Sequence, residues 1–243
     1  MEIISLVPAA FIVLAASIVK GTTAFGFALV ATPLLLLLWE PLVVVPILIP
    51  TGIVVDILIV TKNRHRLEWG RVAPMTVTGI LGIPLGTMIL LVVPSTALKI
   101  VVALAVLASA TILMTGAKVN ISRERVVSSI AGFISGLLLS STTIAGPPVL
   151  LFLINQRWSK DVFRSSLALF FLMLQGFAIV SLAVSGTLTV STLAVSIALW
   201  PSALLGYALA VRALPYISQE VFLRIATVVV MVSGILALVT AVM

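Results

Sequence analysis

Residues 137–153 read LLLSSTTIAGPPVLLFL, which sets four hydroxyl side chains and a Gly-Pro-Pro sequence into an otherwise apolar run. Serine and threonine can satisfy backbone groups that a broken helix leaves without partners, and proline interrupts a helix. In a bilayer, broken backbone is tolerated only where protein or a wet cavity surrounds it. We therefore predict that the chain leaves the helix inside the membrane between residues 140 and 148, with Pro147 and Pro148 breaking the helix.

The composition of the whole chain supports a membrane setting. Of the 243 residues, 62% are hydrophobic and 9% are charged, and the mean hydropathy is +1.36. Soluble domains carry charge on roughly a quarter of their residues. Apolar segments follow one another with only short polar gaps, so we predict one transmembrane domain over residues 1–243 of an all-α integral membrane protein. The first twenty residues lack a basic start and are interpreted as a retained span.

The sequence offers no material for a metal centre. It contains no cysteine, and its one histidine, His65, lies in a basic segment. Thiolate and histidine-based metal sites are therefore excluded, and we expect no cofactor.

Basic residues explain the net charge of +7 without a nucleic-acid partner. They gather in short segments around residues 62–71, 118–125 and 157–164, as the positive-inside rule requires for cytoplasmic loops. We therefore expect a multi-pass protein of the cytoplasmic membrane whose surroundings are lipid, with no nucleic-acid partner. A homo-oligomer is left open.

These loops set the predicted topology. Apolar segments at 42–61, 72–91 and 98–118 in the first half, and at 163–185, 188–211 and 221–242 in the second, each have the length of one crossing. The segment 126–156 must begin and end on the same side. Its 31 residues would form a helix of roughly 46 Å, too long for one crossing and too short for two. A hairpin of two short helices that turns inside the membrane satisfies this constraint.

A second hairpin is predicted at residues 2–39, interrupted at the sequence KGTTAFGF of residues 20–27. Matching Gly21 with Gly136 and Pro33 with Pro148 uses one offset of 115 residues, and Gly86 matches Gly206 later in the chain. We interpret this order of matches as an internal duplication, with repeats at about 1–118 and 126–243. Each half has one hairpin and three crossings, so the halves must be inverted, as in many secondary transporters.

The two interruptions predict an anion site. A half-helix that begins inside the membrane points its free N–H groups at the gap, and those after Gly26 and Gly146 would both do so. The predicted substrate-binding residues are, in chain order, Lys20, Gly21, Thr22, Thr23, Gly26, Ser140, Ser141, Thr142, Thr143, Gly146 and Gln175. For the hydroxyl residues, packing between helices is the alternative.

Two charged residues within the predicted spans each have two interpretations. Lys20 either contributes charge to the site, or reaches an interface or pairs with Asp56. Asp56 is a candidate for coupling to protons, but its position favours a salt bridge with Lys62 or Arg64.

Four stretches together resemble the TauE/SafE family of sulfite exporters and sulfonate permeases. They are KGTTAFGFALVATPLL, SGLLLSSTTIAGPPVLLFL, RSSLALFFLML and LPYISQEVFLRIATVVVMVSGILAL, which begin at residues 20, 135, 164 and 214. The family often has glycine runs where this chain has AFGF and SSTTIAG. The resemblance implies transport of small sulfur-containing or organic anions, such as sulfite, sulfonates or sulfoacetate, across a cytoplasmic membrane.

We therefore predict a secondary anion transporter that works by alternating access and is coupled to a proton or another ion. An intramembrane enzyme acting on lipid phosphates is the alternative, but that chemistry needs a nucleophile with a base, or metal-binding carboxylates, near the break. With one buried acid and one loop histidine, the sequence favours a protein that is not an enzyme. An anion channel also fits the sequence.

Overall fold

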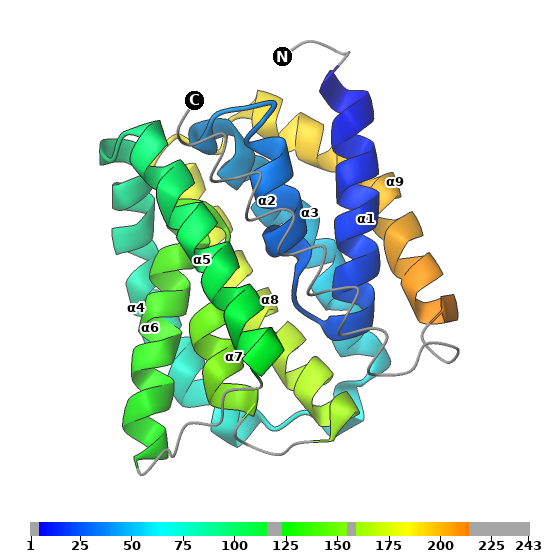
Figure 1. Ribbon diagram of the computed structural model, residues 1–243, viewed down its shortest axis with the longest axis vertical. Helices are drawn as coiled ribbons and strands as arrows, with labels where there is room; N and C mark the ends of the chain where they lie inside the picture. The colour runs from blue at the N-terminus through cyan, green and yellow to red at the C-terminus, as the bar shows by residue number, and fades with distance from the viewer. Residues whose placement is uncertain (1–4, 116–122, 155–158, 214–243) are drawn as a thin grey trace.

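The computed structural model describes residues 5–115, 123–154 and 159–213, which form a bundle of helices (Figure 1). The helices are α1 (Leu6–Thr23), α2 (Phe27–Leu35), α3 (Pro41–Lys62), α4 (Trp69–Val92), α5 (Ser95–Thr115), α6 (Glu124–Thr142), α7 (Gly146–Ile154), α8 (Lys160–Val184) and α9 (Val190–Ala213), with a short 3-10 helix, η2 (Arg64–Arg66), after α3.

Within these ranges, six helices are long and apolar enough to cross a bilayer, namely α1, α3, α4, α6, α8 and α9. The protein is therefore a multi-pass membrane protein. Helices α3, α4, α8 and α9 confirm the crossings predicted at 42–61, 72–91, 163–185 and 188–211. Helix α5 begins three residues before the predicted 98–118 segment and is described to Thr115. The crossing predicted at 221–242 lies outside the described residues.

Each predicted hairpin consists of a long helix, a three-residue break and a short helix. Helices α1 and α6 have 18 and 19 residues, whereas α2 and α7 have nine each. At about 1.5 Å per residue, the long helices measure about 27 Å and the short ones about 14 Å. The prediction of two short helices is therefore wrong for the first member of each pair, which is long enough to be a span by itself.

The second break lies within the predicted residues 140–148, but the two prolines do not form it. Helix α6 ends at Thr142, and Thr143 takes a left-handed conformation with φ of 67°. Helix α7 then begins at Gly146, so that Pro147 and Pro148 lie in its first turn. Proline is tolerated there because the first amides of a helix have no partner within it. The two prolines therefore start a helix, and the prediction that they break one is wrong.

The two breaks have the same backbone form. Helix α1 ends at Thr23 and is followed by Ala24 with φ of 65°, which matches Thr142 and Thr143 of the second break. Thr142 follows Thr23 by 119 residues, and the start of α7 follows the start of α2 by the same number. The predicted offset of 115 residues is therefore four residues short, which is about one helical turn.

Close glycine contacts support the corrected offset. Helix α4 packs most extensively on α6, and α1 packs most extensively on α9. A Cβ on Gly82 of α4 would overlap the Phe133 carbonyl oxygen of α6, and one on Gly206 of α9 would press on the Leu14 carbonyl oxygen of α1. Phe133 follows Leu14 by 119 residues. Gly206 therefore occupies the position of Gly82, and the predicted match to Gly86 is one turn off.

The packing also gives helix directions. Successive contacts advance together along α1 and α9, α3 and α9, α4 and α6, and α4 and α8, so each of these pairs is parallel. Helices α3 and α4 are joined by a short segment and run in opposite directions. Helices α1, α3 and α9 therefore run one way through the bundle, and α4, α6 and α8 run the other way.

These directions bring several basic helix ends together. The ends of α3 and α9 and the starts of α4, α6 and α8 lie at one end of the bundle. Lys62, Arg64, Arg123, Arg125 and Arg212 belong to these segments. This is the end that the charge pattern predicts to face the cytoplasm.

Candidate functional site

A small cavity of about 40 Å³ lies between the two breaks. Residues 25–29 line it from the first break and α2, and residues 143–146 line it from the second break. Helix α3 adds Leu48, Ile49 and Gly52, and α8 adds Phe171 and Gln175. The volume is enough for a few water molecules or a small polyatomic ion. The breaks therefore meet at one place, as their polar sequences predict.

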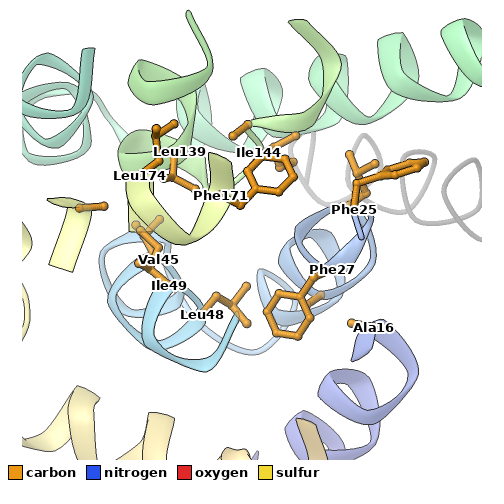
Figure 2. Packing of buried hydrophobic residues seen from close by; sticks show 14 of the residues in the cluster. Ala16, Phe25, Phe27, Val45, Leu48, Ile49, Leu139, Ile144, Phe171 and Leu174 are labelled. Carbon is orange, nitrogen blue, oxygen red and sulfur yellow. The ribbon is translucent and has the colours of Figure 1, made fainter. Parts of the chain in front are cut away.

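Most of the cavity wall is apolar. Phe25 and Phe27 come from the first break and α2, while Ile144 and Phe171 come from the second break and α8 (Figure 2). All four side chains are at most 7% exposed. Such a wall excludes water and strengthens any electrostatic interaction inside the cavity.

Among the described residues that line the cavity, Lys20 is the charged one. It lies in the last turn of α1 and is 3% exposed. Its Nζ donates to Asp56 Oδ2 at 2.6 Å and to the Gly52 carbonyl oxygen at 2.9 Å, and lies 5.4 Å from the centre of the Phe27 ring. An ammonium has three donors. Two of these donors bond the acceptors on α3, so one donor remains for a ligand in the cavity.

Asp56 is fully buried on α3 and faces away from the basic segment that follows the helix. Its Oδ2 accepts from Lys20 and also from Gln175 Nε2, at 2.8 Å. The salt bridge predicted with Lys62 or Arg64 is therefore wrong, and the alternative pairing of Asp56 with Lys20 is confirmed. The sequence-based prediction was wrong because Asp56 lies on the buried face of α3, whereas Lys62 and Arg64 are exposed.

Two buried oxygens of this cluster have no hydrogen-bond donor among the residues that the structure describes. They are Asp56 Oδ1 and Gln175 Oε1. Buried polar atoms without partners are uncommon and each asks for an explanation. The amide and the carboxylate already share one hydrogen bond, so the two bare oxygens belong to side chains that are in contact. Gly52 makes space for this pair, because a Cβ there would lie 3.3 Å from Gln175 Oε1.

Arg164 adds a second buried cation close to the first break. Its Nη2 donates to the Gly21 carbonyl oxygen at 2.6 Å, while its Nε is buried and has no partner in the described part of the chain. The last carbonyls of a helix lack partners within the helix and carry partial negative charge, so an arginine stabilises this end of α1. Sequence reasoning assigned Arg164 to a cytoplasmic loop. Its position in the RSS stretch after a basic segment gave no signal of burial.

The predicted hydroxyl residues divide into two groups. Thr143 lines the cavity, and its hydroxyl bonds that of Thr32 in α2. The other five hydroxyls bond backbone carbonyls, four of them within their own helix or break, and these residues are absent from the cavity lining: Thr22, Thr23, Ser140, Ser141 and Thr142. They close the last helical turns before the breaks, which is the role that serine and threonine take at such positions.

Gly21 also lies outside the cavity lining. A Cβ at this position would come within 2.6 Å of the Ala210 Cβ, so Gly21 lets α9 approach α1 closely. Lys20, Gly26, Thr143, Gly146 and Gln175 are the predicted site residues that line the cavity.

The starts of the two short helices differ as anion sites. Helix α2 begins at Phe27, and the amides of its first turn have no earlier carbonyl to bind within the helix. Phe27, Ala28 and Leu29 all line the cavity. In α7, Pro147 and Pro148 have no N–H, so the prediction that both short helices point free N–H groups at the gap is wrong at these two positions of α7. The first short helix supplies the amides, and the second supplies a stiff wall.

A comparison with protein families decides the class of this molecule. A family model described as sulfite exporter TauE/SafE matches residues 9–237, which include both breaks and every lining residue of the cavity. The chain belongs to the TauE/SafE family. Searches of curated proteins and of solved structures found no significant match.

Membership of the TauE/SafE family confirms the resemblance carried by the broken-helix sequences. The family is one of sulfite exporters, so the chain is of the membrane-transporter type. This agrees with the six spans found among the described helices.

Proposed function

We propose that this TauE/SafE protein is a secondary transporter of the cytoplasmic membrane that carries small sulfur-containing anions, of the sulfite, sulfonate and sulfoacetate class. The anion binds in the cavity between the two breaks. It moves by alternating access and is coupled to a proton or another ion.

The observation that carries this proposal is the position of Lys20. One ammonium donor and the first amides of α2 border the same small, apolar cavity. A negative charge there gains the attraction of the ammonium and of the positive end of the helix dipole. The apolar wall and small volume favour a compact anion over a lipid headgroup with its chains.

Thr143 and Gln175 complete the proposed site. Both line the cavity, and both carry a group able to donate a hydrogen bond. Oxyanions such as sulfite and sulfonates present three oxygens, so a cation, a row of amides and a hydroxyl give each oxygen a partner. In this proposal Thr22, Thr23, Ser140, Ser141 and Thr142 shape the breaks and do not touch the anion.

The arrangement of the halves supports alternating access. The breaks recur after 119 residues with the same backbone form, and the first helix of each pair packs on a partner from the other half of the chain. Equivalent helices run in opposite directions, which is the relation expected of an inverted repeat. We propose that the two halves rock about the cavity and expose it to each side in turn.

Calorimetry on purified protein tests the site. Sulfite, sulfoacetate, ethanesulfonate and sulfate are titrated into wild-type protein, into a Lys20→Met/Asp56→Asn double variant, and into Ser141→Ala as a matched hydroxyl control. The double variant removes the cation without leaving a bare buried charge. We expect affinity to fall at least about tenfold in the double variant, because a hydrogen bond to a charged group contributes about 1.5–3 kcal/mol, and to stay unchanged in Ser141→Ala.

The result that would contradict the proposal is equally specific. Equal anion affinity in the wild-type and double-variant proteins would place the anion away from Lys20. Absence of binding for all four anions, in protein that melts cooperatively, would remove this substrate class.

A further inference from the structure

The buried cluster of Lys20, Asp56 and Gln175 contains a carboxylate, which an anion-binding site does not need. Lys20 and Gln175 line the cavity, whereas Asp56 lies behind them and is 0% exposed. A carboxylate next to the substrate-binding cation competes with an anionic substrate. Its presence therefore requires an explanation.

Charge balance gives the first step. With the cavity empty, the ammonium of Lys20 and the carboxylate of Asp56 neutralise each other at 2.6 Å. An anion that binds Lys20 would leave a net negative charge within the membrane, which is unfavourable in a medium of low dielectric constant. A proton that binds Asp56 at the same time restores neutrality.

The second argument for a proton comes from the two buried oxygens that lack a donor. Asp56 Oδ2 already accepts from Lys20 and Gln175, while Asp56 Oδ1 and Gln175 Oε1 have no donor within residues 5–115, 123–154 and 159–213. A proton on Oδ1 would give this carboxyl a donor beside an acceptor that lacks one. Protonation of Asp56 would also weaken its hold on Lys20 and turn the ammonium towards the cavity.

No other titratable group competes for this role within the described residues around Asp56. On α1 the facing group is Lys20, and on α8 it is the uncharged Gln175. Arg164 of α8 bonds the Gly21 carbonyl, and Tyr207 of α9 donates to the Leu58 carbonyl. Helix α2 carries no titratable side chain, and Lys99 of α5 pairs with Glu40 at the start of α3.

We propose that Asp56 takes up one proton on Oδ1 whenever Lys20 binds the anion, so that the protein carries one proton together with each anion. This inference rests on the proposed anion transport and adds the coupling ion and its site. The proton comes from water on the side from which the anion enters, forms the O–H bond of Asp56, and leaves to water on the other side. With a monovalent anion, the empty and the loaded cluster are both neutral.

A sodium ion is the competing occupant of the two bare oxygens. It would lie next to the ammonium of Lys20 and would find only two side-chain oxygens, although a small cation prefers several oxygen ligands. The proton fits this geometry better, and the experiment includes sodium as a separate condition.

The first arm of the test needs no substrate. Infrared difference spectra of purified protein between alkaline and acidic conditions should show a protonated-carboxyl band that Asp56→Asn removes. Gln175→Leu, which deletes the acceptor, should shift the band, and the exposed Glu68→Gln control should leave it in place. If Asp56→Asn leaves every carboxyl band unchanged, the proton site is wrong.

The second arm measures flux in proteoliposomes. Uptake of ethanesulfonate, whose charge is fixed across the working pH range, is followed together with internal pH, in sodium-free and sodium-containing buffer. We expect about one proton to enter per anion without sodium, and a potassium diffusion potential to leave the rate within about twofold. Asp56→Asn should abolish proton entry and proton-driven accumulation.

The outcomes separate the two proposals. Anion flux without proton entry, proton entry that persists in Asp56→Asn, or a requirement for sodium would each overturn the coupling while leaving anion transport intact. Absence of any anion flux in wild-type protein would instead remove the proposed function, and the infrared arm would still decide whether Asp56 and Gln175 form a proton site.

Discussion

The first and second breaks share one backbone form but differ in their chemistry. The first is bordered by Lys20, by the buried Arg164 and by amides at the start of α2. The second has no charged residue between Leu139 and Ile154, and two prolines replace amides at the start of α7. The two breaks therefore share their backbone geometry, while the charged side chains lie at the first one.

The difference has a physical reason. A cation within a bilayer needs a partner, and Lys20 has one in Asp56 on α3. A second cation at the other break would add repulsion across a cavity of about 40 Å³ and would need its own acid. A single ion pair with a polar neighbour gives a site that is neutral when empty. The uncharged break lines the cavity opposite this ion pair.

The largest expected effect comes from leaving one partner of the ion pair alone. Lys20→Met leaves Asp56 buried without its cation, and breaking a buried pair in this way costs about 3–5 kcal/mol. We expect this variant to lose most folded protein, as judged by thermal unfolding in detergent. The double variant Lys20→Met/Asp56→Asn should recover most of this stability. If Lys20→Met were as stable as wild type, the pair would not be buried as described.

A second prediction concerns the glycine contacts that hold each first helix to the other half. A Cβ on Gly136 would overlap backbone atoms of Gly79, so Gly136→Val should destabilise the protein by more than the about 1–3 kcal/mol typical of overpacking. Gly176→Val is the control, because a Cβ there meets nothing within 4 Å. Thermal unfolding of the two variants makes the comparison. Equal loss would show that the α4–α6 contact is looser than described.

The breaks and the glycine contacts show which parts of the fold can be predicted from the sequence. It located both breaks to within a few residues and predicted four crossings, because apolar length and helix-breaking residues are local signals. It missed the 119-residue offset because this offset pairs Gly21 with Ser140 and Pro33 with Phe152, so the equivalent positions do not carry the same residue types. Matching identical residue types therefore aligned positions that lie about one helical turn away from the equivalent ones.

The site was harder to predict than the fold. Residue type alone placed all the hydroxyls in the site, but the helical turn decides whether a hydroxyl faces a cavity or its own backbone. Ser141 bonds the Leu137 carbonyl, while Thr143, two residues later, lines the cavity. The burial of Arg164 and the pairing of Asp56 with Lys20 depend on contacts between distant helices, which no local pattern reports.

A third prediction separates the two groups of hydroxyls. Thr143→Val removes a cavity hydroxyl and its bond to Thr32, so anion affinity should fall by about threefold to tenfold, as for one hydrogen bond of about 0.5–1.5 kcal/mol. Thr22→Val is the matched change at the first break, where the hydroxyl bonds carbonyls of its own helix. It should leave affinity within twofold. An equal fall in anion affinity in both variants would show that Thr22 also belongs to the binding site.

The smallest effect concerns the left-handed residues of the breaks. Ala24 and Thr143 have positive φ, which disfavours side chains with a Cβ, and glycine adopts it freely. Ala24→Gly should therefore raise the unfolding free energy slightly, by less than about 1 kcal/mol. Thr143→Gly loses the bond to Thr32 and should lower it. Equal shifts measured by denaturant unfolding would show that the Thr143 hydroxyl contributes nothing to the second break.

The most direct test of a site between the two breaks uses the absence of cysteine from this chain. Ala28 and Ala145 line the cavity from opposite breaks, so the variants Ala28→Cys and Ala145→Cys each place one thiol in the cavity wall. Each variant is labelled with a thiol reagent in the presence of increasing concentrations of sulfoacetate, which does not react with the label. We expect sulfoacetate to slow labelling at both positions with the same half-maximal concentration. Protection at only one position, or at neither while binding persists, would contradict a shared site between the breaks.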